Sequence, residues 1–356
     1  MNLPGNNNHR STVRLALPSK GRMEDETIAL LHDCGLTVNK VNPRQYIAQI
    51  PELPNLEIWF QRSADVVRKV RDGDTDLGIV GYDKIAEYRG TNNNVVIIHE
   101  ALGYSHCHLA VAVPEDWADI STIDDLAQMA QSRHSKRPLR IVTKYPRLAE
   151  AFLKRHQVEP YHMLHADGAL EAAPQMGTAD FIVDLVSSGV TLRENRLKEL
   201  ENGQLLQSQA MFMGNRAALA GREDVLKIAK ELLERFEAHL RATEHQTVIA
   251  NVRGQSAEEV ANRIFTQTDL GGLQGPTISP VYLREPTDTN WFAITIVVRK
   301  ARLHRAVEQL RQIGGSGVLV LPVTYIFEEE PARWRNLLET LNLQQDMIRD
   351  PAFPPV

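Results

Sequence analysis

The sequence predicts a mixed α/β protein with two open-sheet lobes and a third, smaller domain. Two observations predict this class. In the first part of the chain, short apolar runs alternate with helical patterns, which is typical of open sheets covered by helices. After a long amphipathic pattern at 223–241, the order becomes strand, helix, strand, strand, helix, strand, the βαββαβ unit of ferredoxin-like domains. With 356 residues and 43% hydrophobic content, the chain can bury several cores.

The elements of the two lobes follow from apolar periodicity and from turn residues. The chain opens with a strand at 13–17 and a helix at 23–34, which Gly35 ends. The strand EIWF at 57–60 precedes a helix that Ser63 could cap, and a strand at 77–80 comes next. Further strands are predicted at 95–98, 108–113, 139–143, 161–165 and 179–183, and further helices at 122–131, 146–156, 169–176 and 192–200.

The C-terminal part of the chain has its own pattern. The helix at 223–241 carries an apolar stripe and is expected to return to the first lobe. The third domain is predicted as strand 247–253, helix 256–267, strands 277–284 and 291–299, helix 301–313 and strand 317–328. After Glu330, a further amphipathic stripe is expected to pack on this domain or on a neighbouring subunit; it consists of Trp334, Leu337, Leu338 and Leu341.

Composition excludes several classes of protein. A net charge of −5 with scattered basic residues gives no general attraction to nucleic acid. No apolar run approaches the ~18 residues of a membrane span, and the polar start lacks a signal-peptide core, so we expect a cytoplasmic protein without a membrane partner. The chain has only two cysteines, Cys34 and Cys107, so we do not expect a disulfide framework. His106, Cys107 and His108 alternate across a strand, so no protein metal site is predicted.

The segment from Glu171 to Leu192 carries the strongest chemical signal. The apolar strand 181–183 leads through Asp184 into a loop of small and hydroxyl residues, namely Ser187, Ser188, Gly189, Val190 and Thr191. Gly189 permits close backbone approach, and the amides and hydroxyls can converge on a phosphate monoester. Asp184 suits the strand end, where it would accept hydrogen bonds from sugar hydroxyls or help to hold a hydrated cation. Together these features suggest a phosphoribosyl ligand, although an ordinary turn and helix cap explains the loop equally well.

The wider pattern resembles the signature of ATP phosphoribosyltransferase, the first enzyme of histidine biosynthesis. The resemblance rests on the spacing of Glu171, Gly177 and Asp184 before SSGVTL. It extends to LALPSKGRM near the start, DLGIVGYD at 76–83, CHLAVAVP at 107–114, RIVTKYPRLAEAFL at 140–153, GPTISPVY and GGSGVLVLPV. These segments run through most of the chain and point to the long form of the family.

The resemblance implies a domain plan. Two periplasmic-binding-protein-like (type II) lobes should enclose a cleft, followed by a C-terminal ferredoxin-like regulatory domain. The first catalytic lobe would hold residues 12–104 and 205–246, and the second, with the phosphoribosyl pyrophosphate loop, residues 105–204. The regulatory domain would be 247–330, with a C-terminal helix and tail at 331–356. The chain should cross between lobes near Tyr104 and Gln204.

The resemblance also implies an activity and partners. The reaction joins N1 of ATP to ribose C1 of phosphoribosyl pyrophosphate and releases pyrophosphate, which makes the enzyme a glycosyltransferase of the pentosyltransferase class. Mg2+ would be carried mainly by the substrates. Histidine would act as feedback inhibitor, and the family forms homo-oligomers, dimers or hexamers.

Site residues are carried over onto matching positions. Lys20 and Arg22 in PSKGR, with Arg62 after the strand EIWF, would meet anionic oxygens; each is also explained as a solvated residue near a helix start. Substrate binding is assigned to Glu171, Asp184, Ser187, Ser188, Gly189, Val190, Thr191, Lys144, Tyr145 and Gly81. Each of these positions also has a purely structural explanation. Glu171 and Asp184 could be helix caps or lie on a helix face, Lys144 and Tyr145 could simply begin a helix, and Gly81 could form a tight turn.

In the third domain, the glycine-rich segments would let a small amino acid bind between subunits. The resemblance implies an allosteric histidine site at Thr277, Ser279, Gly315 and Ser316. These glycines are explained equally well as a turn from helix to strand. Two rival functions stay open: a non-enzymatic ligand sensor with the same two-lobed fold, and a regulatory subunit that has lost catalysis. The retained loop and Lys20 favour an active chain.

Overall fold

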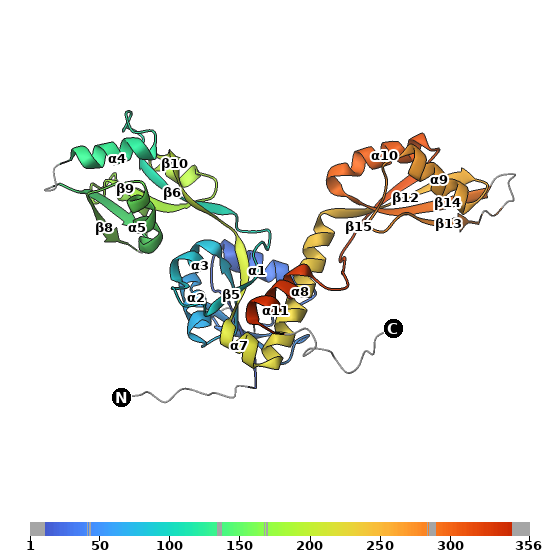
Figure 1. Ribbon diagram of the computed structural model, residues 1–356, viewed down its shortest axis with the longest axis horizontal. Coiled ribbons are helices and arrows are strands. Elements are labelled where there is room, and N and C mark those ends of the chain that lie inside the picture. Colours follow the sequence, from blue (N-terminus) through green and yellow to red (C-terminus); the bar gives the residue numbers. More distant parts are fainter. Residues whose placement is uncertain are drawn as a thin grey trace. The chain divides into compact units, whose positions relative to one another are not determined.

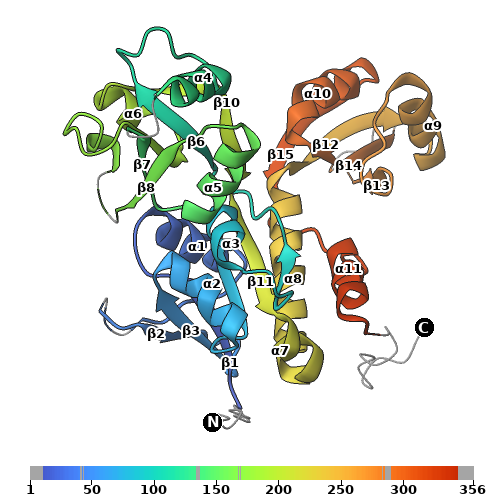
Figure 2. The same cartoon turned by 60° about the vertical axis from the view of Figure 1, so that its left-hand side comes forward.

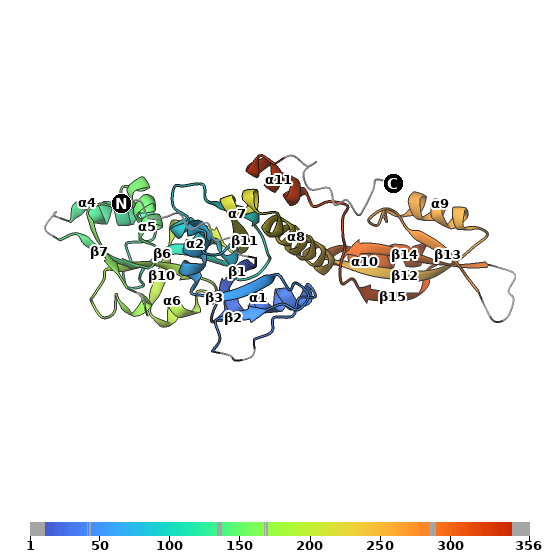
Figure 3. The same cartoon turned by 90° about the horizontal axis from the view of Figure 1, so that it is seen from below.

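A computed structural model describes residues 11–40, 42, 44–133, 137–166, 168, 170–282, 284 and 290–343, without the side chain of His165. The chain divides into two compact units (Figure 1). One unit is Met1–Leu233 together with Ala332–Val356, and the other is Glu234–Pro331. The helix α8 (Glu223–Thr243) carries the chain from the first unit into the second (Figure 3). No helix formed by these described residues combines the length and apolar character needed to cross a membrane.

The first unit contains two sheets, and each forms a lobe with its helices. The first sheet has the order β2-β3-β1-β4-β11-β5. Its central strands β1 (Val13–Pro18), β3 (Leu56–Gln61) and β4 (Leu77–Gly81) are parallel, while β2 (Ile47–Gln49), β11 (Ala210–Asn215) and β5 (Val95–His99) complete it. The helices of this lobe are α1 (Arg22–Asp33), α2 (Ser63–Asp72), α3 (Tyr82–Tyr88) and α7 (Arg216–Gly221). The central strands β1 and β4 are buried on both faces, as parallel strands under helices should be.

The second sheet has the order β10-β6-β9-β7-β8. Its strands are β6 (Cys107–Pro114), β7 (Leu139–Thr143), β8 (Tyr161–His165), β9 (Phe181–Val186) and β10 (Leu197–Ser208). Around it lie α4 (Ile123–Ser132), α5 (Pro146–Arg155), the short 3-10 helix η1 (Leu170–Ala172) and α6 (Val190–Glu194). Thr122 and Asp125 form a reciprocal capping box at the start of α4. The core beneath this sheet includes Leu109, Val111 and Phe181, all fully buried.

The second unit holds a four-stranded sheet of order β13-β14-β12-β15. The element sequence is β12 (His245–Gly254), α9 (Ala257–Gln267), β13 (Thr277–Val281), β14 (Asn290–Arg299), η2 (Lys300–Arg302), α10 (Leu303–Gln312) and β15 (Ser316–Pro322). Alternate residues of β12, namely Val248, Ala250 and Val252, pack with Val260 and Leu310 from the two helices, so both helices cover one face (Figure 2). The predicted βαββαβ order is confirmed.

Most predicted elements are present, but two predicted helices are wrong. The pattern at 192–200 splits, because α6 ends at Glu194 and Leu197 begins β10, where it pairs with Pro114 of β6. Pairing in the sheet overrides helical spacing here. The helix predicted at 169–176 is reduced to η1, and Pro174 explains its end, because proline lacks the amide donor that a helix interior needs.

Smaller differences concern the residues at which elements and lobes begin or end. Ser63 is the first residue of α2 rather than its cap, and β15 ends at Pro322, which pairs with Gln246 near the start of β12. The second crossing between lobes lies at Gln209, later than Gln204, since β10 stays paired with β6 through Ser208.

The C-terminal helix α11 (Ala332–Leu341) belongs to the first unit, and the expectation that it packs on the third domain is wrong. It contacts β5 and α7, and all four residues of its apolar stripe are buried. The backbone carbonyl of Thr340 accepts a hydrogen bond from Arg216 at 2.6 Å, and Arg333 pairs with Glu100 at 2.5 Å. Hydrogen bonds from Arg333 lower the pKa of Glu100 to about 2.

Candidate active site

Three basic residues and one glycine lie at a single edge of the first sheet. Parallel strands β1 and β3 end in register, with Pro18 opposite Gln61, so Lys20 and Arg62 follow neighbouring strand ends. Gly81 ends β4, the strand on the other side of β1. The basic side chains are exposed, and Nη1 of Arg22 donates to Oγ of Ser187 in the second lobe at 3.3 Å. Ligands of open α/β sheets bind at this carboxyl edge.

The corresponding edge of the second sheet gathers the predicted acidic and basic groups. Thr143 pairs with Val183, so Lys144, directly after β7, neighbours Asp184 of β9. Asp184 lies within β9, which continues to Val186, and not at the strand end as expected, because Leu185 and Val186 still pair with β6. Burial raises the pKa of Asp184, and the charge of Glu171 adds to this, while Lys144 and Lys84 act in the opposite direction. Asp184 accepts a hydrogen bond from the amide of Leu185 at 2.8 Å. These groups therefore form one electrostatic cluster.

A buried network joins the two lobes at Tyr145. The Tyr145 hydroxyl donates to Oδ2 of Asp83 at 2.7 Å and accepts from Nζ of Lys84 at 2.7 Å. The other carboxylate oxygen of Asp83 accepts from Oγ of Ser208 at 2.9 Å. Burial and the Asp83 charge raise the pKa of Tyr145, which keeps its hydroxyl neutral, while burial lowers the pKa of Lys84.

This network changes the interpretation of Gly81. A Cβ placed on Gly81 would lie 2.3 Å from Oδ1 of Asp83 and 3.4 Å from Oγ of Ser208. Glycine at this position leaves room for the buried carboxylate, so a structural reason accounts for it. Sequence reasoning missed the roles of Asp83, Lys84 and Ser208, although Asp83 ends the DLGIVGYD segment and Lys84 follows it.

Glu87 of α3 makes a second contact between the lobes, and it caps α5. Its carboxylate oxygens accept the amides of Arg147 and Leu148, both at 3.0 Å, and its backbone carbonyl accepts Nε of Arg147 at 2.9 Å. A carboxylate at a helix start satisfies free amides and favours the helix dipole. No local pattern signals this role, because the cap and its helix are about 60 residues apart.

The predicted phosphate loop is open to solvent. Ser187, Ser188, Val190 and Thr191 are exposed, and Gly189 is half-buried with φ 70°, directly before α6. A Cβ on Gly189 would lie 3.1 Å from Nη1 of Arg193. Ser187 also borders a cavity of about 290 Å³, which is lined by the start of β6 and by 207–209 at the second crossing. The loop thus lies at the junction of the two lobes with its hydroxyls accessible.

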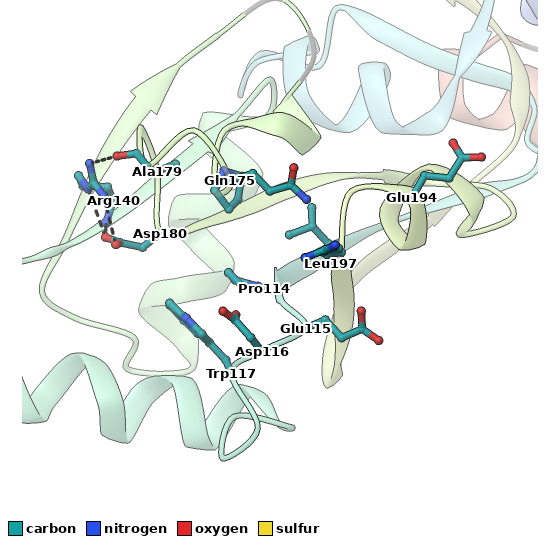
Figure 4. Close-up of a pocket in the computed structure, with 13 residues that line it drawn as sticks. Pro114, Glu115, Asp116, Trp117, Arg140, Gln175, Ala179, Asp180, Glu194 and Leu197 are labelled. Carbon is teal, nitrogen blue, oxygen red and sulfur yellow. Dashed lines mark hydrogen bonds and ion pairs between the residues drawn. The ribbon is translucent and has the colours of Figure 1, made fainter.

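A larger cavity, of about 980 Å³, lies at the opposite end of β9 (Figure 4). Ala179 and Asp180, which precede the strand, line it together with Arg140, whose guanidinium lies 3.3 Å from Asp180. The six residues of β9 at ~3.3 Å each separate this cavity from the loop at 187–191. It contains none of the predicted site residues.

The four predicted histidine-site residues are not brought together within one chain. Thr277 and Ser279 lie on the edge strand β13, whereas Gly315 and Ser316 lie at the opposite edge, at β15. Three strand spacings of ~4.8 Å separate the two edges, more than one amino acid can bridge. A Cβ on Gly315 would lie 2.4 Å from the carbonyl oxygen of Leu310, which explains glycine there.

Comparison with known proteins identifies the family of this chain. The family described as ATP phosphoribosyltransferase matches residues 62–238, and the family described as HisG, C-terminal domain, matches residues 242–325. A solved structure, "ATP phosphoribosyl transferase (HisG:HisZ) complex from Thermotoga maritima", has a TM-score of 0.49 at 22% identity, covering 64% of this chain and 99% of that chain.

Relatives match nearly the full length. The Arabidopsis thaliana protein "ATP phosphoribosyltransferase 2, chloroplastic" is 52% identical over 338 residues, covering 94% of this chain and 82% of the relative. The ATP phosphoribosyltransferase of Rhodopseudomonas palustris (strain BisB18) is 33% identical, covering 89% of this chain and 94% of that relative. The expected fold class, two periplasmic-binding-protein-like lobes with a C-terminal ferredoxin-like domain, is confirmed, and the chain belongs to the ATP phosphoribosyltransferase family.

Proposed function

We propose that this chain catalyses attack of N1 of ATP on C1 of phosphoribosyl pyrophosphate, the first step of histidine biosynthesis. The observation that carries the proposal is the contact between Arg22 and Ser187, which brings the basic edge of the first sheet to the exposed loop of the second. In this proposal, the phosphate loop, the cations and the carboxylates would face one space between the lobes. Positioning and charge dominate such a transfer.

The loop is assigned the 5'-phosphate of the donor. Amides and hydroxyls of Ser187, Ser188, Gly189, Val190 and Thr191 would hold it. The left-handed Gly189 turns the chain into α6 and exposes successive amides. Across the lobes, Lys20, Arg22 and Arg62 would neutralise the pyrophosphate, which takes the electron pair of the breaking C1–O bond.

The acidic cluster is assigned the ribose. Asp184 and Glu171 would accept hydrogen bonds from the ribose hydroxyls and stabilise positive charge that develops on the sugar. Lys144 balances that negative charge, and Tyr145 fixes the lobes through Asp83. The N1 lone pair forms the new bond directly, so no side-chain nucleophile is required.

The proposal includes Mg2+ bound mainly to substrate phosphates. Among the residues that the structure describes, no group of three or more His, Cys, Asp or Glu side chains could hold a metal ion. The Asp184 and Glu171 carboxylates offer oxygen ligands of the kind Mg2+ prefers, directly or through water. When bound, Mg2+ supplies positive charge that neutralises the leaving pyrophosphate.

The remaining parts of the proposal concern regulation and setting. Histidine would inhibit by binding between copies of the chain, because Thr277 and Ser316 lie on opposite sheet edges. This requires a homo-oligomer, a dimer or hexamer, with closed symmetry. We place the protein in the cytoplasm without nucleic-acid or membrane partners; cell fractionation tests this, since two relatives are named as chloroplastic.

The test of function is direct detection of product. Purified protein is mixed with ATP, phosphoribosyl pyrophosphate and Mg2+, and phosphoribosyl-ATP is followed by its ultraviolet absorbance. Calorimetric titration run in parallel separates the enzyme from a ligand sensor, which would bind substrate without consuming it. Binding without product under varied conditions would remove the catalytic proposal.

A further inference from the structure

A cavity of about 660 Å³ lies within the second unit, away from the residues assigned to histidine. Three segments form it: the end of α8 with the start of β12, the loop 269–273, and the end of β14 with η2 and α10. Nδ1 of His245 lies 2.7 Å from the carbonyl oxygen of Arg241 and holds the first of these segments together. The volume is typical of small-molecule sites, about 300–1,000 Å³.

Four arginines line this cavity: Arg241, Arg299, Arg302 and Arg305. Arg305 pairs with Asp269 at 2.7 Å, and Arg241 pairs with Glu328. Within the part of the chain that the structure describes, neither Arg299 nor Arg302 pairs with a carboxylate. The lining contains only two carboxylates, Glu244 and Asp269, so positive charge is in excess.

The backbone adds to this positive charge. The helix α10 begins directly after Arg302, without a side-chain cap and without an acidic residue in its first turn. Helix starts carry partial positive charge and free amides that favour anions. Gly271 also lines the cavity, and a Cβ on it would meet nothing within 4 Å, so there is open space beside this loop.

The uncharged side chain of Gln309 indicates that the ligand carries a hydrogen-bond donor as well as an anionic group. The side-chain oxygen Oε1 of Gln309 is buried, lines the same cavity, and has no hydrogen-bond partner among the described residues. A buried acceptor without a donor is costly, so a ligand that donates an N–H or O–H would satisfy it. Inorganic phosphate could occupy the arginines, but a larger ligand is needed to reach Gln309 as well.

We propose that this cavity binds a nucleoside phosphate. Its phosphate contacts Arg299 and Arg302, and a hydroxyl or amino group of its sugar or base donates to Gln309. The site lies outside the catalytic residues and is independent of the proposed reaction. It would give the small domain a second effector besides an amino acid.

Hydrogen exchange on the full-length protein, with adenosine monophosphate as probe, localises the binding. Amides of 299–309 are expected to gain protection. This protection should vanish in the double variant Arg299→Gln, Arg302→Gln and persist in the control Arg311→Gln, which removes an exposed charge from the same helix outside the cavity. Any protection of 187–191 reports the catalytic loop separately, so the two sites are distinguished.

Affinity measurements complete the test. The double arginine variant should weaken nucleotide binding at this site at least about tenfold, because the phosphate would lose its hydrogen bonds to two charged groups. Gln309→Leu should weaken the binding of adenosine monophosphate by roughly threefold or more and leave the binding of inorganic phosphate unchanged. Absence of protection at 299–309, or equal protection by inorganic phosphate at the same concentration, would overturn the proposal.

Discussion

The Tyr145 hydroxyl lies 2.7 Å from Oδ2 of Asp83, and this hydrogen bond joins the second lobe to the first. Both side chains are buried. Burial and the neighbouring Asp83 charge raise the pKa of Tyr145, so its hydroxyl stays neutral. In this arrangement the Asp83 residue is only 3% exposed. The bond therefore fixes how the two carboxyl edges face each other.

Replacing Tyr145 by phenylalanine should destabilise the first unit by ~1–3 kcal/mol, because Asp83 would lose a donor in a buried site. Urea unfolding followed by circular dichroism measures the change. Tyr161→Phe is the matched control, since its ring packs on the core of the second lobe while its hydroxyl bonds to none of the described residues. Equal losses in both variants would contradict a special role for Tyr145.

Gly189→Ala should raise the KM for phosphoribosyl pyrophosphate far more than the KM for ATP. The backbone at φ 70° disfavours a side chain by ~1–2 kcal/mol, and the new Cβ presses on Arg193. Gly90→Ala is the control: its φ of 75° carries the same backbone cost on an exposed turn of the first lobe. Thr191→Val should have the same selectivity as Gly189→Ala. Parallel rises in both KM values would argue against a phosphate loop.

Asp184→Asn should make the protein more stable at neutral pH and less active. Burial raises the pKa of Asp184, so above the ordinary value of about 3.9 the folded state holds the proton more tightly than the unfolded state. The free energy of unfolding therefore falls as pH rises through this range. Asparagine does not ionise, so the Asp184→Asn variant should lack this pH-dependent loss of stability. Its kcat/KM should be lower by roughly 10- to 100-fold.

Melting temperatures between pH 3 and pH 7 check the Asp184 prediction. The variant and the parent should agree at the acid end and diverge towards neutral pH, with Asp119→Asn as an exposed control. A variant that is less stable than the parent at pH 7 would show that Asp184 is stabilised as an anion.

Trp334→Ala should destabilise the first unit by ~3–5 kcal/mol, because the ring is 1% exposed and anchors α11. Glu339→Ala, on the exposed face of the same helix, should change stability by less than ~0.5 kcal/mol. Thermal unfolding of full-length protein gives both values. A small effect of Trp334→Ala would mean that α11 is not docked in solution.

Histidine inhibition is best tested with point variants. Deleting the chain from the start of the third domain onward would also remove α11 from the first unit, so a change in inhibition could not be assigned to the third domain alone. Thr277→Val and Ser316→Ala lie on opposite sheet edges, and each should raise the histidine concentration for half-inhibition severalfold without changing activity in its absence. Because coupling between two ligands is reciprocal, substrate should also have a smaller effect on histidine binding in these variants. Unchanged inhibition in both variants would place the inhibitor elsewhere.

Sequence reasoning recovered the elements whose signal is local. The apolar run at Val13, the stripe of α2 and the βαββαβ order all follow from periodicity, and the structure contains them. The failure at 192–200 has a long-range cause. Leu197 has helical spacing, yet its pairing with Pro114, far away in the chain, makes it a strand residue.

The site shows the same division. The loop at 187–191 and the residue Asp184 stand out in the sequence because their chemistry is concentrated in one segment. Asp83, Lys84 and Glu87 do not stand out, because their roles depend on partners about 60 residues away on the other lobe. Conversely, Gly81 drew attention as a ligand contact, whereas its neighbour Asp83 explains it.

The small unit is an insertion, since the chain enters it through α8 and returns to the first unit at α11. It is therefore tethered at two points. A single proteolytic cut inside it would leave both flanking helices attached to the catalytic part, and any rearrangement that follows effector binding can pull on two separate places of that part at once.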